Sequence, residues 1–322
     1  MFVCSLQKNN SHTSFQNAII TIGNYDGIHL GHQSLIRVLL QIAAEQNKVS
    51  LVLTFEPSIQ QHFAKTKLIE VNPNNPNNLM SGQLNLGGLR RKFEVLKTMG
   101  VDFLAVASPK HSFISMSAEN FISNILVERL AIDTILVGKD FHFGHKRLGT
   151  IATLQQQTKF KTIVFPDTCD SNQRISSTNI RTLINMGRIT EATRLLGSPL
   201  SGYGRIVRGL GIGASLGFPT ANIYSTNLQS WPMGVYIAKM HRNKNNIRTA
   251  HLCALSIGTR PTIAHAVGKV IEAHLLDYSG SLYGEWVHIE MLDKIRDQER
   301  YHTREALISA IAHDCALVRT WK

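Results

Sequence analysis

The chain has 322 residues, enough for two domains of ordinary size. It is 43% hydrophobic and 17% charged, the composition of an ordinary soluble protein, and its formal net charge of +12 favours anionic partners. The basic residues are scattered, with no Lys/Arg block and no interleaved aromatic residues, so we expect no nucleic-acid partner.

The first half of the chain alternates short apolar runs with helical patterns. The expected strands are Ala18–Gly23, Val49–Phe55, Val101–Ala107, Thr134–Val137 and Thr162–Phe165. The expected helices between them are Gly31–Ala44, Leu84–Met99 and Ala118–Leu130. This alternation predicts an α/β domain with a parallel sheet, which binds ligands outside the carboxyl ends of its strands. The Pro/Asn-rich segment Val71–Asn78 predicts a surface loop, with a mobile flap as the alternative.

The second half has a different pattern. Helical spacing continues through Ser177–Gly187 and Thr190–Leu196, after which glycine turns separate short strands. These strands are Tyr203–Arg208, Val235–Met240, Thr249–Ile257, Lys269–Asp277 and Trp286–Met291. They predict a small all-β barrel, closed by the amphipathic helix Arg304–Arg319. We therefore expect a first domain over 1–186, a linker over 187–200 and a second domain over 201–322.

The sequence lacks the features of a zinc protein, a disulfide-rich protein, a secreted protein and a membrane protein. The cysteines lie far apart, at Cys4, Cys169, Cys253 and Cys315, which argues against a zinc site or a disulfide scaffold. Residues 1–15 lack the apolar core of a signal peptide, and no apolar run is long enough to span a bilayer. We expect a cytoplasmic protein without a membrane partner; self-association stays open.

A glycine-framed pair of histidines marks the first candidate site. Strand Ala18–Gly23 runs into a loop that carries Gly23, Gly27, His29, Gly31 and His32 at the start of a helix. Helix N-termini bind phosphate through their free N–H groups, and two histidines three residues apart can face one ligand. A lone histidine at a helix start is usually structural. Two of them in this frame predict a phosphate site.

A second segment strengthens this prediction. Ser177 and Thr178 open a helix and Arg181 follows one turn later, an arrangement that can hold the same anion. Alone, this segment would be read as an ordinary helix cap with a surface arginine.

The first half of the chain resembles the adenylyltransferase module of bacterial bifunctional riboflavin kinase/FAD synthetases. The resemblance rests on His-x-Gly-His, on Leu53–Pro57, on Val137–Gly144 and on Ile175–Arg181. It implies a Rossmann-like nucleotidylyltransferase fold and transfer of AMP from ATP to FMN, giving FAD, with Mg²⁺. The ATP-binding residues that it implies are Gly23, Tyr25, Asp26, Gly27, His29, His32, Asp140, Ser177, Thr178 and Arg181. It implies catalytic roles for His29, His32 and Arg181. Phe141 and Phe143 could be core residues or could pack on a ring system.

The second half carries its own motif. Leu216–Ile223 (LGFPTANI) follows the glycine-rich stretch Gly209–Gly213, and Thr220 and Asn222 offer two oxygens at alternate positions. Such oxygens suit Mg²⁺, and glycine-rich backbone can enclose phosphates. Alone, the motif could be an ordinary turn before a strand.

Further segments follow this motif in a fixed order, and together they resemble the riboflavin kinase module of the same family. These segments are Gly234–Tyr236, Ser256–Thr262, Ile271–Asp277, Leu282–Gly284 and Ile295–Glu299. The resemblance implies that Gly217, Pro219, Thr220 and Asn222 bind ATP, with Thr220 and Asn222 also holding Mg²⁺. Glu272 becomes the candidate catalytic base for riboflavin, ahead of Asp277 and Glu290, because of its flanking residues.

One departure keeps an alternative open. Many relatives carry Arg at the position of Ala214, so a cation near the ATP phosphates is absent unless Arg205 or Arg208 replaces it. The alternative function is an adenylyltransferase whose barrel binds flavin without phosphorylating it. His142, Ser58, Ile59 and Ile263 are further departures, which bear on binding details.

Overall fold

The structure, a computed structural model, describes residues 1–6, 17–59, 62–63, 84–170, 173–244, 247–259 and 269–321. The predicted loop 71–78 and the motif residues 260–263 lie outside the described residues. The chain divides into two compact units, Met1–Thr66 with Leu89–Ser176 and Lys67–Gly88 with Ser177–Lys322. Within the described part of the chain, no helix combines the length and the apolar character needed to cross a membrane.

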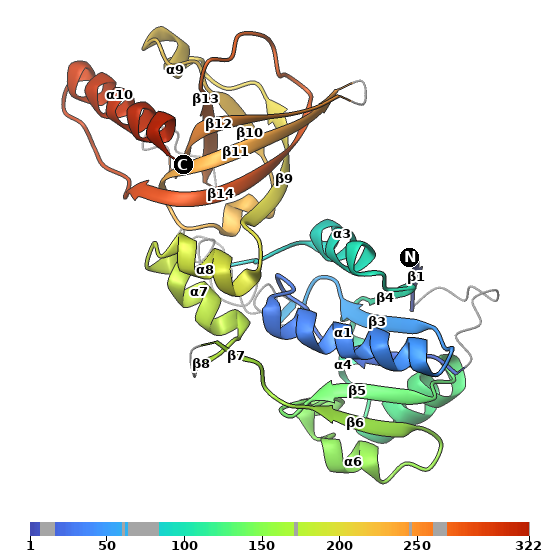
Figure 1. The fold of residues 1–322 in the computed structure, drawn as a ribbon. Helices are drawn as coiled ribbons and strands as arrows, with labels where there is room; N and C mark the ends of the chain where they lie inside the picture. Colours follow the sequence, from blue (N-terminus) through green and yellow to red (C-terminus); the bar gives the residue numbers. More distant parts are fainter. Residues whose placement is uncertain are drawn as a thin grey trace. The chain divides into compact units, whose positions relative to one another are not determined.

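The first unit is built on a parallel sheet of six strands in the order β1-β4-β3-β2-β5-β6 (Figure 1). The strands are β1 (Phe2–Ser5), β2 (Ile19–Ile22), β3 (Ser50–Phe55), β4 (Phe103–Ala107), β5 (Thr134–Gly138) and β6 (Lys161–Phe165). Every residue of β2 and β3 is buried, as expected for central strands covered on both faces. The predicted parallel sheet is confirmed. The edge strand β1 was not predicted, because four half-exposed residues carry no periodic pattern.

Helices cover both faces of this sheet. On one face lie α1 (Leu30–Glu45) and α3 (Leu89–Met99). The other face is covered by α5 (Ala118–Asn120), by the π-helical segment Phe121–Arg129 that continues it, and by α6 (Ile151–Gln155). The short helix α4 (His111–Ile114) precedes α5. Strand β3 shows the division, because Val52 joins the core under α1 while Leu51 and Leu53 join the opposite core. The helix expected over Ala118–Leu130 is present and is mainly π-helical.

The order of the strands places the first candidate site. Strand β2 pairs with β3 on one side and with β5 on the other, so the direction in which strands are added reverses at β2. Ligands of open parallel sheets bind at such a switch point, beyond the carboxyl ends of the two strands. The loops that follow β2 and β5 therefore leave the same edge of the sheet side by side.

The second unit is a closed antiparallel barrel in the order β10-β13-β12-β11-β14-β9. The strands are β9 (Leu200–Val207), β10 (Ala221–Tyr224), β11 (Gly234–Lys244), β12 (Ile247–Gly258), β13 (Val270–Leu275) and β14 (Trp286–Arg296). Side chains alternate between inside and outside, and Val287, Ile289 and Met291 of β14 fill the interior. The predicted barrel is confirmed, including its closing helix α10 (Arg304–Thr320).

Two helices precede the barrel and belong to its unit. They are α7 (Ser177–Asn185) and α8 (Ile189–Leu196), and α8 packs against β14 and β9. The apolar side of α8 is continuous, since Ile189, Ala192, Leu195 and Leu196 are all buried.

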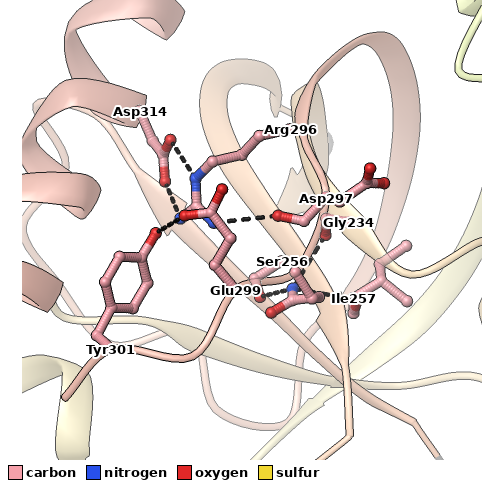
Figure 2. Close-up of polar contacts among 9 residues, drawn as sticks. Gly234, Ser256, Ile257, Arg296, Asp297, Glu299, Tyr301 and Asp314 are labelled. Carbon is pink, nitrogen blue, oxygen red and sulfur yellow. Dashed lines mark hydrogen bonds and ion pairs between the residues drawn. The ribbon is translucent and has the colours of Figure 1, made fainter.

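A buried ion pair fixes α10 to the barrel. Asp314 of α10 is 3% exposed and receives two hydrogen bonds from Arg296 at the end of β14, at 3.0 and 2.7 Å (Figure 2). Next to it, the amide of Gln298 donates to the carbonyl oxygens of Gly234 and Ile257. Val318 adds an apolar contact with Ile237 and Ala254 on the outer wall of the barrel.

Removing Asp314 should destabilise the barrel unit. Asp314→Ala leaves Arg296 half-buried without its counter-charge, and breaking a buried pair on one side costs about 3 kcal/mol. The free energy of unfolding can be followed by tryptophan fluorescence, because all three tryptophans, Trp231, Trp286 and Trp321, lie in this unit.

Asp297→Ala is the matched control. The side chain of Asp297 is 81% exposed although it also pairs with a cation, Lys294, and such a surface pair contributes less than about 1 kcal/mol. Equal losses in the two variants would contradict the importance assigned to the buried pair.

Candidate functional sites

The two histidines of the first site form a stacked pair at the start of α1. Their ring centroids lie 3.6 Å apart with an interplanar angle of 14°. His29 is the N-cap residue of α1, and its Nδ1 accepts a hydrogen bond from the backbone N–H of His32 at 3.3 Å. In neutral His29 the proton is therefore on Nε2, which makes Nε2 the donor nitrogen of the ring.

Tyr25 supports this pair from the side. Its ring meets that of His32 edge-on, with 5.1 Å between centroids, and its hydroxyl bonds to that of Thr21 at 2.6 Å. Burial raises the pKa of Tyr25, so its hydroxyl stays protonated. Tyr25 at φ +46° and Gly27 at φ +75° turn the backbone sharply between β2 and α1. A Cβ atom on Gly23 would lie only 3.1 Å from the Tyr25 ring, so a larger residue here would force the ring to shift.

A buried lysine that the sequence analysis missed lies close to this loop. Lys92 of α3 is 3% exposed, and its Nζ donates to the carbonyl oxygen of Phe55 at 3.3 Å and to the hydroxyl of Thr54 at 3.4 Å. It also lies 3.7 Å from a carboxylate oxygen of Glu56. The available signal was its position in the helix, four residues before the buried Leu96, where an apolar residue is expected.

The electrostatics of the site disfavour a positive charge on His32. Burial lowers the pKa of His32 well below its usual range, and the positive charges of His29 and Lys92 lower it further. Burial also lowers the pKa of Lys92, while the negative charges of Glu56 and Asp26 counteract part of that shift. Asp26 is itself 7% exposed.

At the end of β5, Asp140 is held by an ion pair. Arg174 bonds to Asp140 and lies 3.2 Å from Asp167, which in turn pairs with Lys139 at 2.7 Å. The hydrogen bond from Arg174 holds the pKa of Asp140 below its usual range. The carboxylate of Asp140 is therefore ionised and fixed in direction beside the histidine loop.

A cavity of about 770 Å³ opens at this edge of the sheet. Its walls include the ring-bearing residues Phe55, Phe63, Phe113, Phe121, Phe141 and Phe143, together with Gly23, Asn24 and Asp140. Phe143 is buried, Phe141 is half-buried, and their rings stack with centroids 5.7 Å apart. The exposed side chains of Lys146 and Arg147 lie at its rim. The cavity thus has an aromatic interior and a basic rim.

The other predicted phosphate ligands lie in the second unit. Ser177 and Thr178 begin α7, and Nε of Arg181 donates to the carbonyl oxygen of Leu84 at 2.9 Å. The chain that leads to them runs past the start of α1 in the first unit, where a Cβ on Gly31 would lie 3.5 Å from the carbonyl oxygen of Ile175.

The second candidate site lies on the outer wall of the barrel. Asn222 of β10 and Glu272 of β13 are directly opposite in the strand register, so their side chains share one face. Thr220 and Glu272 line a cavity of about 400 Å³ that also includes Leu307 and Ile311 of α10. The structure thus brings Thr220, Asn222 and Glu272 together, although 50 residues separate the last two in sequence.

Glycines shape the loop in front of these residues. A Cβ on Gly209 would lie 2.1 Å from Nδ2 of Asn222, and one on Gly213 would lie 2.5 Å from the carbonyl oxygen of Phe218. Gly217, at φ +87°, faces open space, and the carbonyl oxygen of Pro219 bonds to the His274 ring at 2.8 Å.

Comparisons with known proteins match the two halves of the chain separately. A family model described as FAD synthetase matches residues 11–179, and one described as Riboflavin kinase matches residues 196–322. A protein from Haemophilus influenzae named bifunctional riboflavin kinase/FMN adenylyltransferase is 34% identical over 308 residues, covering 95% of this chain and 94% of its own. One of the same name from Escherichia coli K12 is 32% identical, covering 93% and 91%.

The chain belongs to the bifunctional riboflavin kinase/FMN adenylyltransferase family. A solved structure described as a macrolide-efflux protein from Streptococcus pneumoniae is also similar, with a TM-score of 0.81 and 26% identity over the whole of both chains. The FAD synthetase match extends to Asn179, past the last residue of the first compact unit at Ser176. The matched region and the compact unit therefore end at different residues.

The structure shows which arginines lie near Ala214, the position where many relatives carry Arg. Ala214 is exposed on the short helix α9 (Ile212–Ser215), and the next residue, Ser215, accepts a hydrogen bond from Arg304 at 2.6 Å. Arg205 bonds to the carbonyl oxygen of Gly284, and Arg208 lies over the Tyr283 ring. Arg304 of α10 therefore places a cation against α9.

One further group could hold a metal ion among the described residues. His241, His288 and Glu290 lie on β11 and β14, and His241 already bonds to Glu290 at 2.8 Å. These strands differ from β10 and β13, which carry Asn222 and Glu272. The nitrogen-rich ligand set also differs from the oxygen ligands that Mg²⁺ prefers.

Gly209→Ala tests the close packing against Asn222. The added methyl group forces the Asn222 amide or the chain at residue 209 to move, and overpacking of this kind costs about 1–3 kcal/mol. Tryptophan fluorescence during urea unfolding measures the loss. Gly88→Ala is the control because its Cβ meets only an ordinary contact, Asn227 at 3.7 Å. A Gly209→Ala variant as stable as Gly88→Ala would show that Asn222 is not held in this way.

Proposed function

We propose that the chain converts riboflavin to FMN on its barrel and FMN to FAD at the histidine site, using one ATP in each step. The observation that carries the proposal is the presence of two separate cavities, one with Lys146 and Arg147 at its rim and one lined by Thr220 and Glu272. Each lies in a region that matches one of the two family models. We assign FMN adenylylation to residues 1–186 and riboflavin phosphorylation to 201–322, with 187–200 as the connection.

In the kinase step, Glu272 acts as the base. The ribityl 5′-hydroxyl oxygen forms a bond to the γ-phosphorus of ATP, the bond to the β–γ bridging oxygen breaks, ADP leaves and the proton passes to Glu272. The register that sets Asn222 opposite Glu272 supports this assignment, since it places the base beside an amide group whose N–H₂ can donate to the phosphate.

The kinase residues also fit a magnesium ion. Thr220 and Asn222 offer hydroxyl and amide oxygens, the hard ligands that Mg²⁺ prefers. When bound, the ion neutralises charge on the phosphates of ATP. Gly217 and Pro219 belong to the loop around the phosphates, and the apolar side chains of Leu307 and Ile311 provide a surface for the flavin ring.

In the adenylyl-transfer step, the protein positions two anionic substrates. A phosphate oxygen of FMN forms a bond to the α-phosphorus of ATP, the bond to the α–β bridging oxygen breaks and pyrophosphate leaves. No protein nucleophile takes part. His29, His32, Ser177, Thr178 and Arg181 hold the phosphates of ATP.

The residues around the histidines complete this site in our proposal. The loop residues Gly23, Tyr25, Asp26 and Gly27 shape the nucleotide site, with Asp140 beside it. The aromatic cavity fits the flavin ring of FMN, and its basic rim fits the negative charge.

Two variants should separate the activities. His32→Ala removes a hydrogen-bond donor to the phosphates and should slow FAD formation from FMN about 100-fold. Glu272→Gln removes the base and should slow FMN formation from riboflavin about 100-fold or more. Each variant should keep the other activity within twofold of wild type. Chromatographic separation of flavins, from riboflavin or FMN incubated with ATP and Mg²⁺, measures both.

The controls decide between this proposal and its alternative. Loss of both activities in a folded His32→Ala protein would contradict the assignment of the two activities to separate sites. Wild-type protein that makes FAD from FMN but no FMN from riboflavin would favour the alternative of a flavin-binding barrel without kinase activity, with Ala214 as the first residue to restore to Arg.

A further inference from the structure

Lys92 is a buried cation next to the histidine loop, and its contacts reach the end of β3 and that loop. Its ammonium group donates to the Thr54 hydroxyl at 3.4 Å and to the Phe55 carbonyl at 3.3 Å. The Thr54 hydroxyl in turn donates to the carbonyl oxygen of Asn24 at 3.1 Å. Asn24 is the first residue after Gly23 in the loop that carries His29. This chain of hydrogen bonds ties α3 and β3 to the loop.

The second contribution of Lys92 is its charge. His32 has a buried Nδ1 with no hydrogen-bond partner among the described residues, so a second ring proton there would be an unpaired donor. The His29 ring stacks on it at 3.6 Å, which also disfavours a positive charge. The charge of Lys92 acts in the same direction, and burial together with these two neighbours lowers the pKa of His32.

The other groups around His32 and Lys92 do not reverse this effect. The Tyr25 ring meets His32 edge-on while its hydroxyl is bonded to Thr21, so it brings no charge. The carboxylates of Glu56 and Asp26 act on Lys92 and favour its charged form. Replacing Lys92 therefore removes a positive charge near His32 without changing the ring of His29 or of His32.

We propose that Lys92 is a positioning residue for adenylyl transfer, fixing the histidine loop through Thr54 and keeping His32 as a neutral hydrogen-bond donor. The proposal rests on the proposed function, because the donor serves the phosphates of ATP. Lys92 itself is too deeply buried to bind them.

The test compares two variants that break the same ion pair from opposite sides. Lys92→Met removes the cation while keeping a long apolar chain, and Glu56→Gln removes its partner while leaving the cation. The His32 ring is followed by NMR in protein with isotope-labelled histidine, its resonance assigned with His32→Gln. In Lys92→Met the pKa of His32 should rise by about one unit, the size of shift that a nearby charge produces. In Glu56→Gln it should not rise.

Enzyme assays give the second readout. In Lys92→Met the acidic limb of the pH profile for FAD formation should move to higher pH by the same amount, with riboflavin phosphorylation within twofold of wild type. The phosphorylation rate shows that the second unit is intact, and circular dichroism checks the helices of the first.

Three results would overturn the proposal. One is an unchanged His32 titration in a folded Lys92→Met protein, which would make Lys92 a structural pairing partner. Another is an equal rise of the His32 pKa in both variants. If Lys92→Met does not fold, a rise of the His32 pKa in Glu56→Gln would by itself overturn the proposal. Failure of the proposed function is distinguishable, because wild-type protein would then form no FAD while the NMR titration could still be read.

Discussion

The hydrogen bond between Nδ1 of His29 and the backbone N–H of His32 organises the first site. It ends the loop from β2, begins α1, and leaves Nε2 of His29 as the nitrogen that can donate. It also brings the two rings into the stacked arrangement that disfavours a second positive charge. The sharp turn at Tyr25 and Gly27, the buried Lys92 and the hydroxyl of Thr54 all support this short segment. The site is therefore formed by backbone capping as much as by its side chains.

The second site depends on pairing between strands. Asn222 and Glu272 meet because β10 and β13 are neighbours in one register, and Gly209 leaves room for the Asn222 amide. The cavity wall opposite them is a helix held by the Arg296–Asp314 pair and by Val318 (Figure 2). In the first unit, loops present the functional groups, whereas in the second a rigid wall of the barrel does. This difference fits the two kinds of cavity, one aromatic with a basic rim and one smaller and bordered by a helix.

The sequence predicted those parts of the structure that leave local patterns. Apolar runs located β2 and β3, and strand pairing places Glu272 opposite Asn222 of the second motif. The roles of His32 and Glu272 stay predictions. Features that depend on distant contacts were missed. Lys92 looks like an ordinary helix residue until Thr54, Phe55 and Glu56 are brought to it across the core, and β1 gains its strand form only by pairing with β4. Periodicity also could not separate a π-helical turn from an α-helix over Phe121–Arg129, since both bury one face.

Closure of the barrel holds the strands of the second site in register. In an open sheet, an edge strand can slip or fray without disturbing the rest. Here β10 is bonded to β13 on one side and to β9 on the other, so it has no free edge. Shifting Asn222 past Glu272 by one residue would require breaking both ladders of the strand at once. The alignment of these two side chains is thus protected by the cooperativity of the whole barrel.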